Sequence, residues 1–158
     1  MSNQPIVICD LDGTLSSASW RLPFVKNKDW KGFYDRIPFD RPNQEVLRFL
    51  HSRDAAGGKT IYLTGRPEDY RDITSDWLRR HGLRDSPLLM RRSGDFRPDY
   101  VVKEEILDTK LKSMEVELVI EDRTNVIAMW KRRGFRVWEI RDPGHDPYPT
   151  PYTLQDKT

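Results

Sequence analysis

Short apolar runs alternate along the chain with segments whose apolar residues recur at helical spacing. The first run, residues 5–10, is rich in β-branched residues and ends abruptly in acid and glycine, which is typical of a buried strand. Similar runs predict four further strands, at residues 60–63, 87–90, 116–120 and 135–140. Apolar stripes with the spacing of one helix face predict helices around residues 46–50, 70–78, 102–107 and 126–130.

Strands that alternate with helices predict an α/β fold, a Rossmann-like domain with a mostly parallel five-stranded sheet and helices on both faces. Right-handed crossovers bring the carboxyl ends of such strands to one edge of the sheet, where the sites of these folds lie. Residues 1–141 are interpreted as this single domain. Residues 16–41 break the alternation and are interpreted as a small cap insertion over the site, and residues 142–158 as a proline-rich C-terminal tail.

The composition narrows the class of protein. Charged residues make up 33% and hydrophobic residues 37% of the chain, yet the net charge is only +2, so a compact domain is favoured over a disordered chain. No apolar stretch approaches the ~20 residues of a membrane span, and no signal-peptide pattern begins the sequence. The single cysteine, Cys9, excludes an intrachain disulfide. We therefore expect a cytoplasmic protein with no membrane partner.

Acidic residues follow two of the predicted strands. Asp10 and Asp12 point to the same side of an extended backbone, and carboxylates this close repel each other unless a cation lies between them. Mg²⁺ is the predicted partner, because it prefers carboxylate oxygens. Gly13 allows the chain to turn tightly after the strand. Glu121 and Asp122 either complete the metal shell or simply begin the helix that follows, where acids are favoured.

Two further motifs lie at strand ends or in the loops that follow. The hydroxyl, backbone N–H and guanidinium of Thr64-Gly65-Arg66 can hold phosphate oxygens, and a turn before a helix is the alternative. Lys103 stands at the predicted start of a helix, four residues after Asp99, where it opposes the helix dipole. This position indicates either a function or a solvated lysine. Because the fold brings all of these groups to one edge, together they predict one site.

The motifs, taken in order, resemble the four motifs of the haloacid dehalogenase (HAD) superfamily over roughly residues 5–140. They are Asp10-x-Asp12-Gly13-Thr14, Thr64-Gly65-Arg66, Lys103 and Glu121-Asp122. The second aspartate of the first motif is typical of the phosphatase and phosphotransferase branch of this superfamily. The resemblance therefore implies chemistry on phosphate esters.

Residues 94–106 and 122–132 carry a closer resemblance, to the phosphatase half of phage-type polynucleotide kinase/3′-phosphatases. Arg21 corresponds to an arginine that this family carries shortly after its first motif. The family usually has two aspartates where this chain has Glu121-Asp122. Residues 57–60 (Gly-Gly-Lys-Thr) imitate the end of a P-loop but lead into a predicted strand, so they are interpreted as a turn and no kinase half is expected.

The resemblance implies a Mg²⁺-dependent phosphomonoesterase that acts through an aspartyl-phosphate intermediate and removes 3′-phosphates in nucleic-acid repair. Its substrate would be a phosphorylated nucleic-acid end or a nucleotide. The implied nucleophile is Asp10, and the implied general acid and base is Asp12. The implied phosphate ligands are Thr64, Gly65 and Lys103, with Asp99 orienting Lys103, and the implied substrate-binding residues are Arg21 and Arg66. The implied metal ligands are Asp10, Asp12 and Asp122, supported by Glu121.

The substrate contacts and the function class leave alternatives open. A local basic rim is expected from four arginines, Arg21, Arg66, Arg91 and Arg92. Aromatic side chains of the insertion either stack on a base or pack onto the core, and they are Trp20, Phe24 and Trp30. The alternative enzyme is a small-molecule HAD phosphatase such as a 5′-nucleotidase. The alternative outside catalysis is a HAD-fold binding module.

Overall fold

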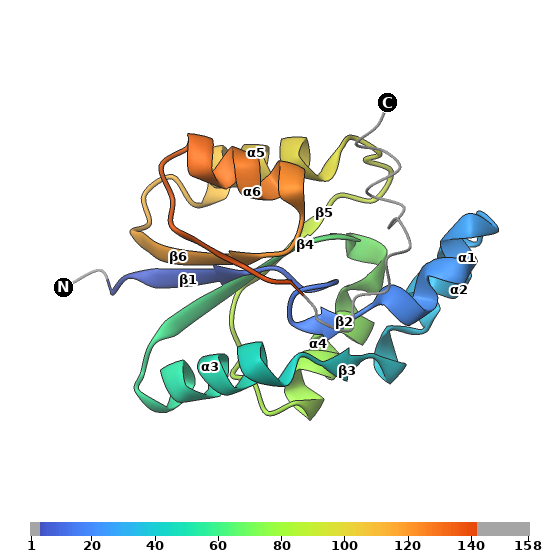
Figure 1. The fold of residues 1–158 in the computed structure, drawn as a ribbon, viewed down its shortest axis with the longest axis horizontal. Coiled ribbons are helices and arrows are strands. Elements are labelled where there is room, and N and C mark those ends of the chain that lie inside the picture. The colour runs from blue at the N-terminus through green and yellow to red at the C-terminus, as the bar shows by residue number, and fades with distance from the viewer. Residues whose placement is uncertain (1–3, 142–158) are drawn as a thin grey trace.

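A five-stranded parallel sheet forms the centre of the computed structural model, which describes residues 4–141 (Figure 1). The sheet order is β5-β4-β1-β6-β7, and every neighbouring pair is parallel. The strands are β1 (Ile6–Cys9), β4 (Lys59–Pro67), β5 (Leu88–Arg91), β6 (Val116–Glu121) and β7 (Val137–Glu139). The predicted α/β fold is therefore confirmed. The predicted tail, residues 142–158, lies outside the described residues.

Two helical layers cover the two faces of the sheet, and β1 shows how its residues are divided between them (Figure 1). Val7 and Cys9 belong to the core beside α3 (Gln44–Ala55) and α4 (Arg71–Arg80). Ile6 and Ile8 belong to the core beside α5 (Asp99–Lys110) and α6 (Thr124–Arg132). Since successive side chains of a strand point to opposite faces, a central strand buried on both faces is apolar throughout.

Residues 16–41, here termed the cap segment, leave the domain and return to it at nearly the same point. β2 (Ser16–Ser17) pairs antiparallel with β3 (Arg41–Pro42), with Ser16 opposite Pro42. Four short helices lie between these strands, η1 (Ser19–Arg21), α1 (Leu22–Lys26), α2 (Trp30–Asp35) and η2 (Ile37–Phe39). Figure 1 shows α1 and α2 beyond the carboxyl end of the sheet, on the side where the predicted site residues lie.

Several boundaries differ from the sequence prediction. β4 continues through Pro67 and is followed by η3 (Glu68–Tyr70), so residues 64–66 lie within the strand, where the register with β5 shifts. α5 begins at Asp99, an acid at the favourable positive end of a helix dipole, so Lys103 lies in its second turn rather than at its start. β7 is shorter than predicted. Of residues 57–60, predicted as a turn, only the start forms one, with Gly57 at φ +81°, because β4 already begins at Lys59.

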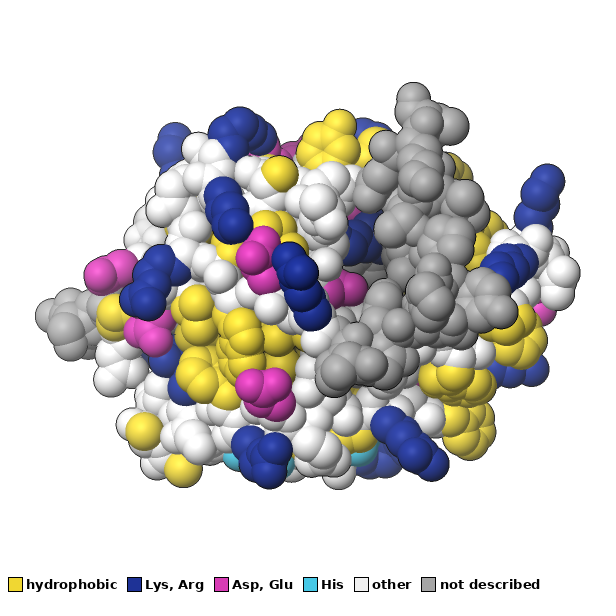
Figure 2. Space-filling model, viewed as in Figure 1, with side chains coloured by type: hydrophobic (Ala, Val, Ile, Leu, Met, Phe, Trp, Pro, Cys, Tyr) yellow, Lys and Arg dark blue, Asp and Glu magenta, His cyan; other side chains and the backbone are white. Residues whose placement is uncertain are grey.

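Charge on the surface is mixed rather than concentrated. Figure 2 shows Lys and Arg side chains interspersed with Asp and Glu side chains over the face drawn there, in keeping with the small net charge. A groove that follows a nucleic-acid backbone needs a continuous basic stripe, and none is visible among the described residues of the face drawn in Figure 2. Within residues 4–141, no helix combines the length and the apolar character needed to cross a membrane.

Candidate active site

The loop after β1 brings the first two acidic residues to the carboxyl edge of the sheet. Asp10 directly follows the strand, and its backbone N–H donates to the carbonyl oxygen of Ile120 on β6 over 3.1 Å. Gly13 then turns the chain at φ +80°. A Cβ atom on Gly13 would lie 2.1 Å from Oδ2 of Asp122, so this position requires glycine both for its backbone angle and for space. The turn therefore packs the first motif directly against the last.

Lys103 lies at the centre of the first group of charges. Its Nζ is 2.8 Å from Oδ1 of Asp10, 2.8 Å from Oε2 of Glu121 and 3.3 Å from Oδ2 of Asp99. Burial alone would lower the pKa of Lys103, but the three carboxylates outweigh it and raise this pKa well above its ordinary value. The lysine is thus held as a cation beside Asp10, which contradicts the solvated alternative considered from the sequence.

A carboxylate cluster, Asp10, Glu121 and Asp122, has the character of a metal site. One oxygen from each of the three lies within 4.8 Å of the others. Glu121 is engaged by the protein, because Oε2 accepts from Lys103 and Oε1 from the backbone N–H of Asp122 at 3.2 Å. Oγ1 of Thr14 lies 2.9 Å from Oδ2 of Asp10 and 3.1 Å from Oδ1 of Asp122.

The charge of this cluster fits a hard cation. Burial and the neighbouring charge of Asp10 raise the pKa of Asp122 to about 7, so the ionised form lacks a sufficient counter-charge. The side-chain donors are all carboxylate oxygens, the type that Mg²⁺ prefers. Asp10 and Asp122 are the members suited to bind the ion, and Glu121 supports the site by holding Lys103.

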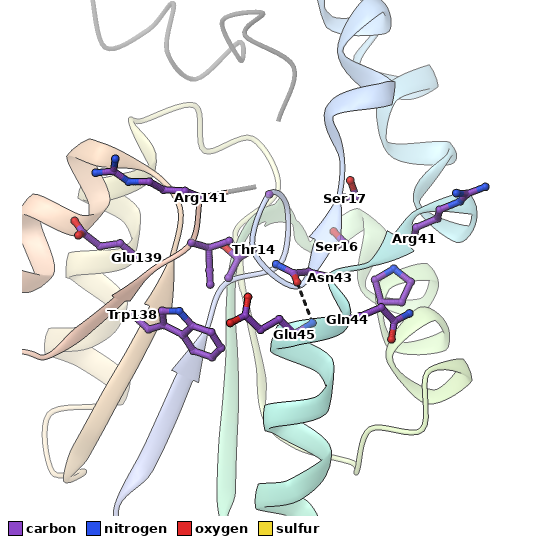
Figure 3. Close-up of a pocket in the computed structure, with 13 residues that line it drawn as sticks. Thr14, Ser16, Ser17, Arg41, Asn43, Gln44, Glu45, Trp138, Glu139 and Arg141 are labelled. Atoms are coloured by element: carbon purple, nitrogen blue, oxygen red, sulfur yellow. Dashed lines mark hydrogen bonds between the residues drawn. The ribbon is translucent and has the colours of Figure 1, made fainter. Parts of the chain in front are cut away.

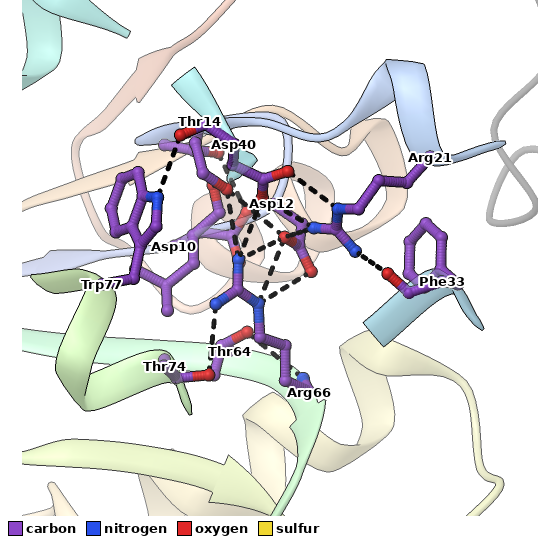
Figure 4. Close-up of polar contacts among 12 residues, drawn as sticks. Asp10, Asp12, Thr14, Arg21, Phe33, Asp40, Thr64, Arg66, Thr74 and Trp77 are labelled. Atoms are coloured by element: carbon purple, nitrogen blue, oxygen red, sulfur yellow. Dashed lines mark hydrogen bonds and ion pairs between the residues drawn. The ribbon is translucent and has the colours of Figure 1, made fainter. Parts of the chain in front are cut away.

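A second group of charges surrounds Asp12 and consists of Asp12, Asp40, Arg21 and Arg66; we term it the Asp12 clamp. Nη2 of Arg21 donates to Oδ1 of Asp12 over 2.7 Å, and Nη2 of Arg66 donates to the same oxygen over 2.6 Å. Arg21 also binds both oxygens of Asp40, at 2.8 Å each. Figure 4 shows Arg21 reaching Asp12 from the cap segment and Arg66 reaching it from β4.

The clamp fixes the charge and position of Asp12. Burial acts to raise the pKa of Asp12, but the Arg66 and Arg21 guanidiniums together hold it well below its usual range. Asp10 and Asp12 are only two residues apart, yet one lies beside a lysine and a carboxylate cluster and the other between two arginines. Such a difference in environment is how neighbouring carboxyl groups acquire different roles.

The Thr64-Gly65-Arg66 motif packs closely against Asp99. A Cβ atom on Gly65 would lie 2.2 Å from Oδ1 of Asp99, so glycine is required there for close approach. Oγ1 of Thr64 accepts from the backbone N–H of Arg66 over 3.2 Å, the local bond of the turn alternative. Asp99 in turn contacts Nη1 of Arg123 at 3.0 Å. The structure thus brings the predicted residues of all four motifs to the same end of the sheet.

The prediction that four arginines form a basic rim is wrong for two of them. Arg21 and Arg66 are 0% and 1% exposed, because their guanidiniums are held by carboxylates beneath the surface. Arg92 is exposed, and Arg91 is partly buried and donates to the carbonyl oxygen of Gly65 over 2.9 Å.

Three residues of the site were missed from the sequence, and they are Thr14, Asp40 and Arg123. Thr14 belongs to the first motif and Arg123 lies in the run 122–132 that carries the closer resemblance, so their positions carried a signal although no role was assigned to them. Asp40 gives no such signal, because it is a single acid at the end of the cap segment. Its pairing with Arg21 depends on the way that segment folds back onto the domain.

Two hollows border the site. One, of about 490 Å³, is lined by Gly13 and Thr14, by the end of β7 and by the start of α3 (Figure 3). At the start of α3, the Asn43 side chain accepts a hydrogen bond from the backbone N–H of Glu45. The other, of about 440 Å³, is lined by Gly65 and by side chains of the cap segment and the loop after β5. Each shares a motif residue with the site.

A parallel five-stranded sheet with these motifs at its carboxyl edge defines a HAD-type phosphatase domain, a hydrolase of phosphate esters. A model of the polynucleotide kinase PNKP phosphatase domain family matches residues 4–144, and the chain belongs to this family. The resemblance drawn from the motifs is thereby confirmed.

Solved structures agree with this assignment. Two structures of the Pnkp1/Rnl/Hen1 complex, one described as an RNA repair complex, contain a chain that is 31% identical, with TM-scores of 0.74 and 0.75. They match 89% and 87% of this chain but only 43% and 45% of their own, so this chain spans less than half their length. A class C acid phosphatase from Bacillus anthracis with tungstate bound shares the fold, at 15% identity, TM-score 0.66, and coverage of 100% of this chain and 74% of that one.

Replacing Asp40 by asparagine tests the clamp. Asp40→Asn removes the charge that faces Arg21 and leaves that buried guanidinium with less compensation, so we expect a loss of ~3 kcal/mol in the free energy of unfolding. Urea unfolding measures it. The matched control is Asp35→Asn, also in the cap segment, whose exposed pair with Lys31 predicts a change of under ~0.5 kcal/mol. Equal effects of the two substitutions would contradict a structural role for the clamp.

Proposed function

We propose that this domain is a Mg²⁺-dependent phosphomonoesterase that removes the 3′-phosphate from a nucleic-acid end or a nucleotide. The observation that carries the proposal is the meeting of Asp10, Lys103 and Asp122 at one point in a chain of the PNKP phosphatase family. The similarity to Pnkp1 of an RNA repair complex supports a nucleic-acid substrate and a role in end repair.

Asp10 is the proposed nucleophile. One of its carboxylate oxygens attacks phosphorus in line with the ester oxygen, the P–O bond of the ester breaks, and an aspartyl-phosphate forms. The ammonium of Lys103, 2.8 Å from Asp10, and the backbone N–H of Gly65 would neutralise and orient the phosphoryl oxygens, with Thr64 beside them. Asp99 acts as a positioning residue, because it contacts Lys103.

Asp12 is the proposed general acid and base. The clamp keeps Asp12 ionised in the free protein, so the proton for the first step has to enter with the substrate. A phosphate monoester that binds as its monoanion passes this proton to Asp12, and Asp12 then gives it to the departing alkoxide, which leaves as the 3′-hydroxyl. In the second step it takes a proton from water as the water oxygen attacks the aspartyl-phosphate, releasing inorganic phosphate and restoring Asp10. Arg21 and Arg66 fix the direction of the Asp12 carboxylate, so we propose that they act on the substrate through Asp12 rather than by touching the phosphate.

Mg²⁺, held by Asp10 and Asp122 with Asp12 contributing from the same loop, would supply charge neutralisation at the phosphate. This is consistent with a carboxylate cluster that carries more negative charge than Lys103 balances. Glu121 keeps Lys103 in place and supports the cluster from behind.

The nucleophile is tested by Asp10→Asn. This change keeps the shape of the side chain but removes its ability to form the aspartyl-phosphate, so phosphate release should fall by ~10³-fold or more. The control is Asp108→Asn, at an exposed position on α5, which should keep the wild-type rate. An Asp10→Asn protein that releases phosphate at close to the wild-type rate would overturn the mechanism.

The metal site is tested by Asp122→Asn. Loss of this carboxylate should raise the Mg²⁺ concentration needed for half-maximal rate by at least ~10-fold, as is usual when the coordination of a site is disturbed. Calorimetric titration of the full chain with Mg²⁺ in the absence of substrate gives a second readout. Asp76→Asn, exposed on α4, should leave both values unchanged. A wild-type chain that needs no divalent cation would refute the site.

Substrate position is tested with four substrates, oligonucleotides of one sequence carrying a 3′- or a 5′-phosphate and the corresponding 3′- and 5′-mononucleotides. The 3′-phosphates should be hydrolysed at least ~10-fold faster in kcat/KM, a difference equivalent to ~1.4 kcal/mol of binding in the transition state. Inorganic phosphate release is measured, with the Asp10→Asn protein as the blank. Preference for the 5′-mononucleotide would instead support the 5′-nucleotidase alternative.

A further inference from the structure

The hollow of about 440 Å³ beside Gly65 is lined by four aromatic rings, and we term it the aromatic pocket. The rings are those of Trp30 and Tyr34 in α2, Tyr70 in η3 and Phe96 in the loop between β5 and α5. Its volume lies in the range of ~300–1,000 Å³ that is usual for small-molecule sites. Since Gly65 lies against Asp99 and also lines the pocket, this hollow is continuous with the phosphate end of the site.

The aromatic wall is ordered by its own packing. Trp30 and Tyr34 are stacked at 6.3 Å between ring centroids and 25° between planes, and Tyr34 and Tyr70 at 4.7 Å and 29°. The three rings are therefore stacked in series from α2 in the cap segment to η3. Trp30 nevertheless remains 39% exposed and Phe96 94% exposed. A flat aromatic ligand could cover these exposed rings, and stacking of this kind is how proteins hold single-stranded bases.

The charged side chains that line the pocket are already engaged within the protein. Asp69 accepts from the hydroxyl of Ser93 over 2.8 Å, and the Asp95 carboxylate accepts from Arg97 at 2.7 and 3.0 Å. Arg91 donates to the backbone oxygens of Asp95 and Arg97. Side chains that are paired with one another cannot read the hydrogen-bonding edge of a base without breaking these contacts. The charged side chains of the pocket therefore add little selectivity among bases to its aromatic surface.

Arg91 joins the pocket to the phosphate end of the site. Its Nε donates to the carbonyl oxygen of Gly65 over 2.9 Å, while its Nη1 holds the loop that carries Phe96. The Arg91 side chain thus links the loop that carries Phe96 to Gly65 in the Thr64-Gly65-Arg66 motif. A ligand seated in the pocket would be held at a fixed distance from Lys103 and Asp10.

We propose that the aromatic pocket binds the base of the nucleoside that carries the scissile phosphate, by stacking and without selecting its identity. This inference rests on the proposed phosphatase function and adds to it the part of the substrate that is recognised. Base stacking predicts that a substrate with a base is processed about 10-fold better in kcat/KM than one without. It also predicts similar values for all four bases.

The test uses the full chain and 3′-phosphorylated oligonucleotides that differ only in the terminal residue, which carries adenine, cytosine, guanine, uracil or no base. The ratio of kcat/KM with a base to that without should be about 10 for the wild type. In Phe96→Ala it should fall toward 1, mainly through KM. The control is Phe39→Ala, which removes an exposed phenyl ring that lies in the cap segment and outside the pocket. This variant should keep the wild-type ratio.

Trp30 provides the second test. Trp30→Phe keeps an aromatic ring and should retain most of the ratio, whereas Trp30→Leu should lose it, so rescue by the conservative variant separates stacking from a packing defect. A wild-type ratio near 1, or equal ratios in Phe96→Ala and Phe39→Ala, would overturn the proposed role of the aromatic pocket. Neither result would contradict the proposed phosphatase function. If no 3′-phosphate is released from any of these substrates, the proposed function itself is wrong.

Discussion

The ammonium of Lys103 is buried between three carboxylates, and the arrangement of the catalytic end of the domain depends on this contact. Asp10 comes from the end of β1, Glu121 from the end of β6 and Asp99 from the start of α5. Without the lysine, the three carboxylates would be buried charges of the same sign. Their repulsion would destabilise the contact between α5 and this edge of the sheet. The same cation that would neutralise a phosphate therefore also holds α5 against the sheet.

The protein separates two adjacent carboxylates by giving each its own counter-ions. Asp10 shares Lys103 with other acids, and the pKa of nearby Asp122 is raised to about 7 as a result of burial and crowding of negative charge. Asp12 faces two guanidiniums that keep its pKa low. One short loop thus contributes Asp10 to a cluster with excess negative charge and Asp12 to a clamp in which two carboxylates face two guanidiniums. Two carboxyl groups only two residues apart are thereby set in opposite electrostatic surroundings.

Much of this arrangement could be predicted from the sequence, because it follows from local pattern and strand order. The apolar runs gave the five strands, and alternation with helices brought Asp10, Lys103 and Asp122 to one edge. The depth of Arg21 and Arg66 could not be predicted in this way. It depends on Asp40, whose place is set by the pairing of β2 with β3 and by the folding of the cap segment, a non-local result that no periodicity encodes. The start of α5 was missed for a different reason, since Asp99 contributes a favourable charge rather than an apolar stripe.

Buried ion pairs and hydrogen bonds hold the cap segment on the domain, and they restrict how far it can move. Arg21 extends from this segment to Asp12, and the indole N–H of Trp77 in α4 donates to the backbone oxygen of Asp40 over 3.0 Å. A lid that swung away would have to break these contacts in a site shielded from water and would leave Asp12 without one of its partners. We therefore expect the cap segment to remain closed during turnover. Substrate would then enter and product leave through the hollows that border the site, without movement of the cap segment, and the rate of the proposed reaction would be set by chemistry or product release.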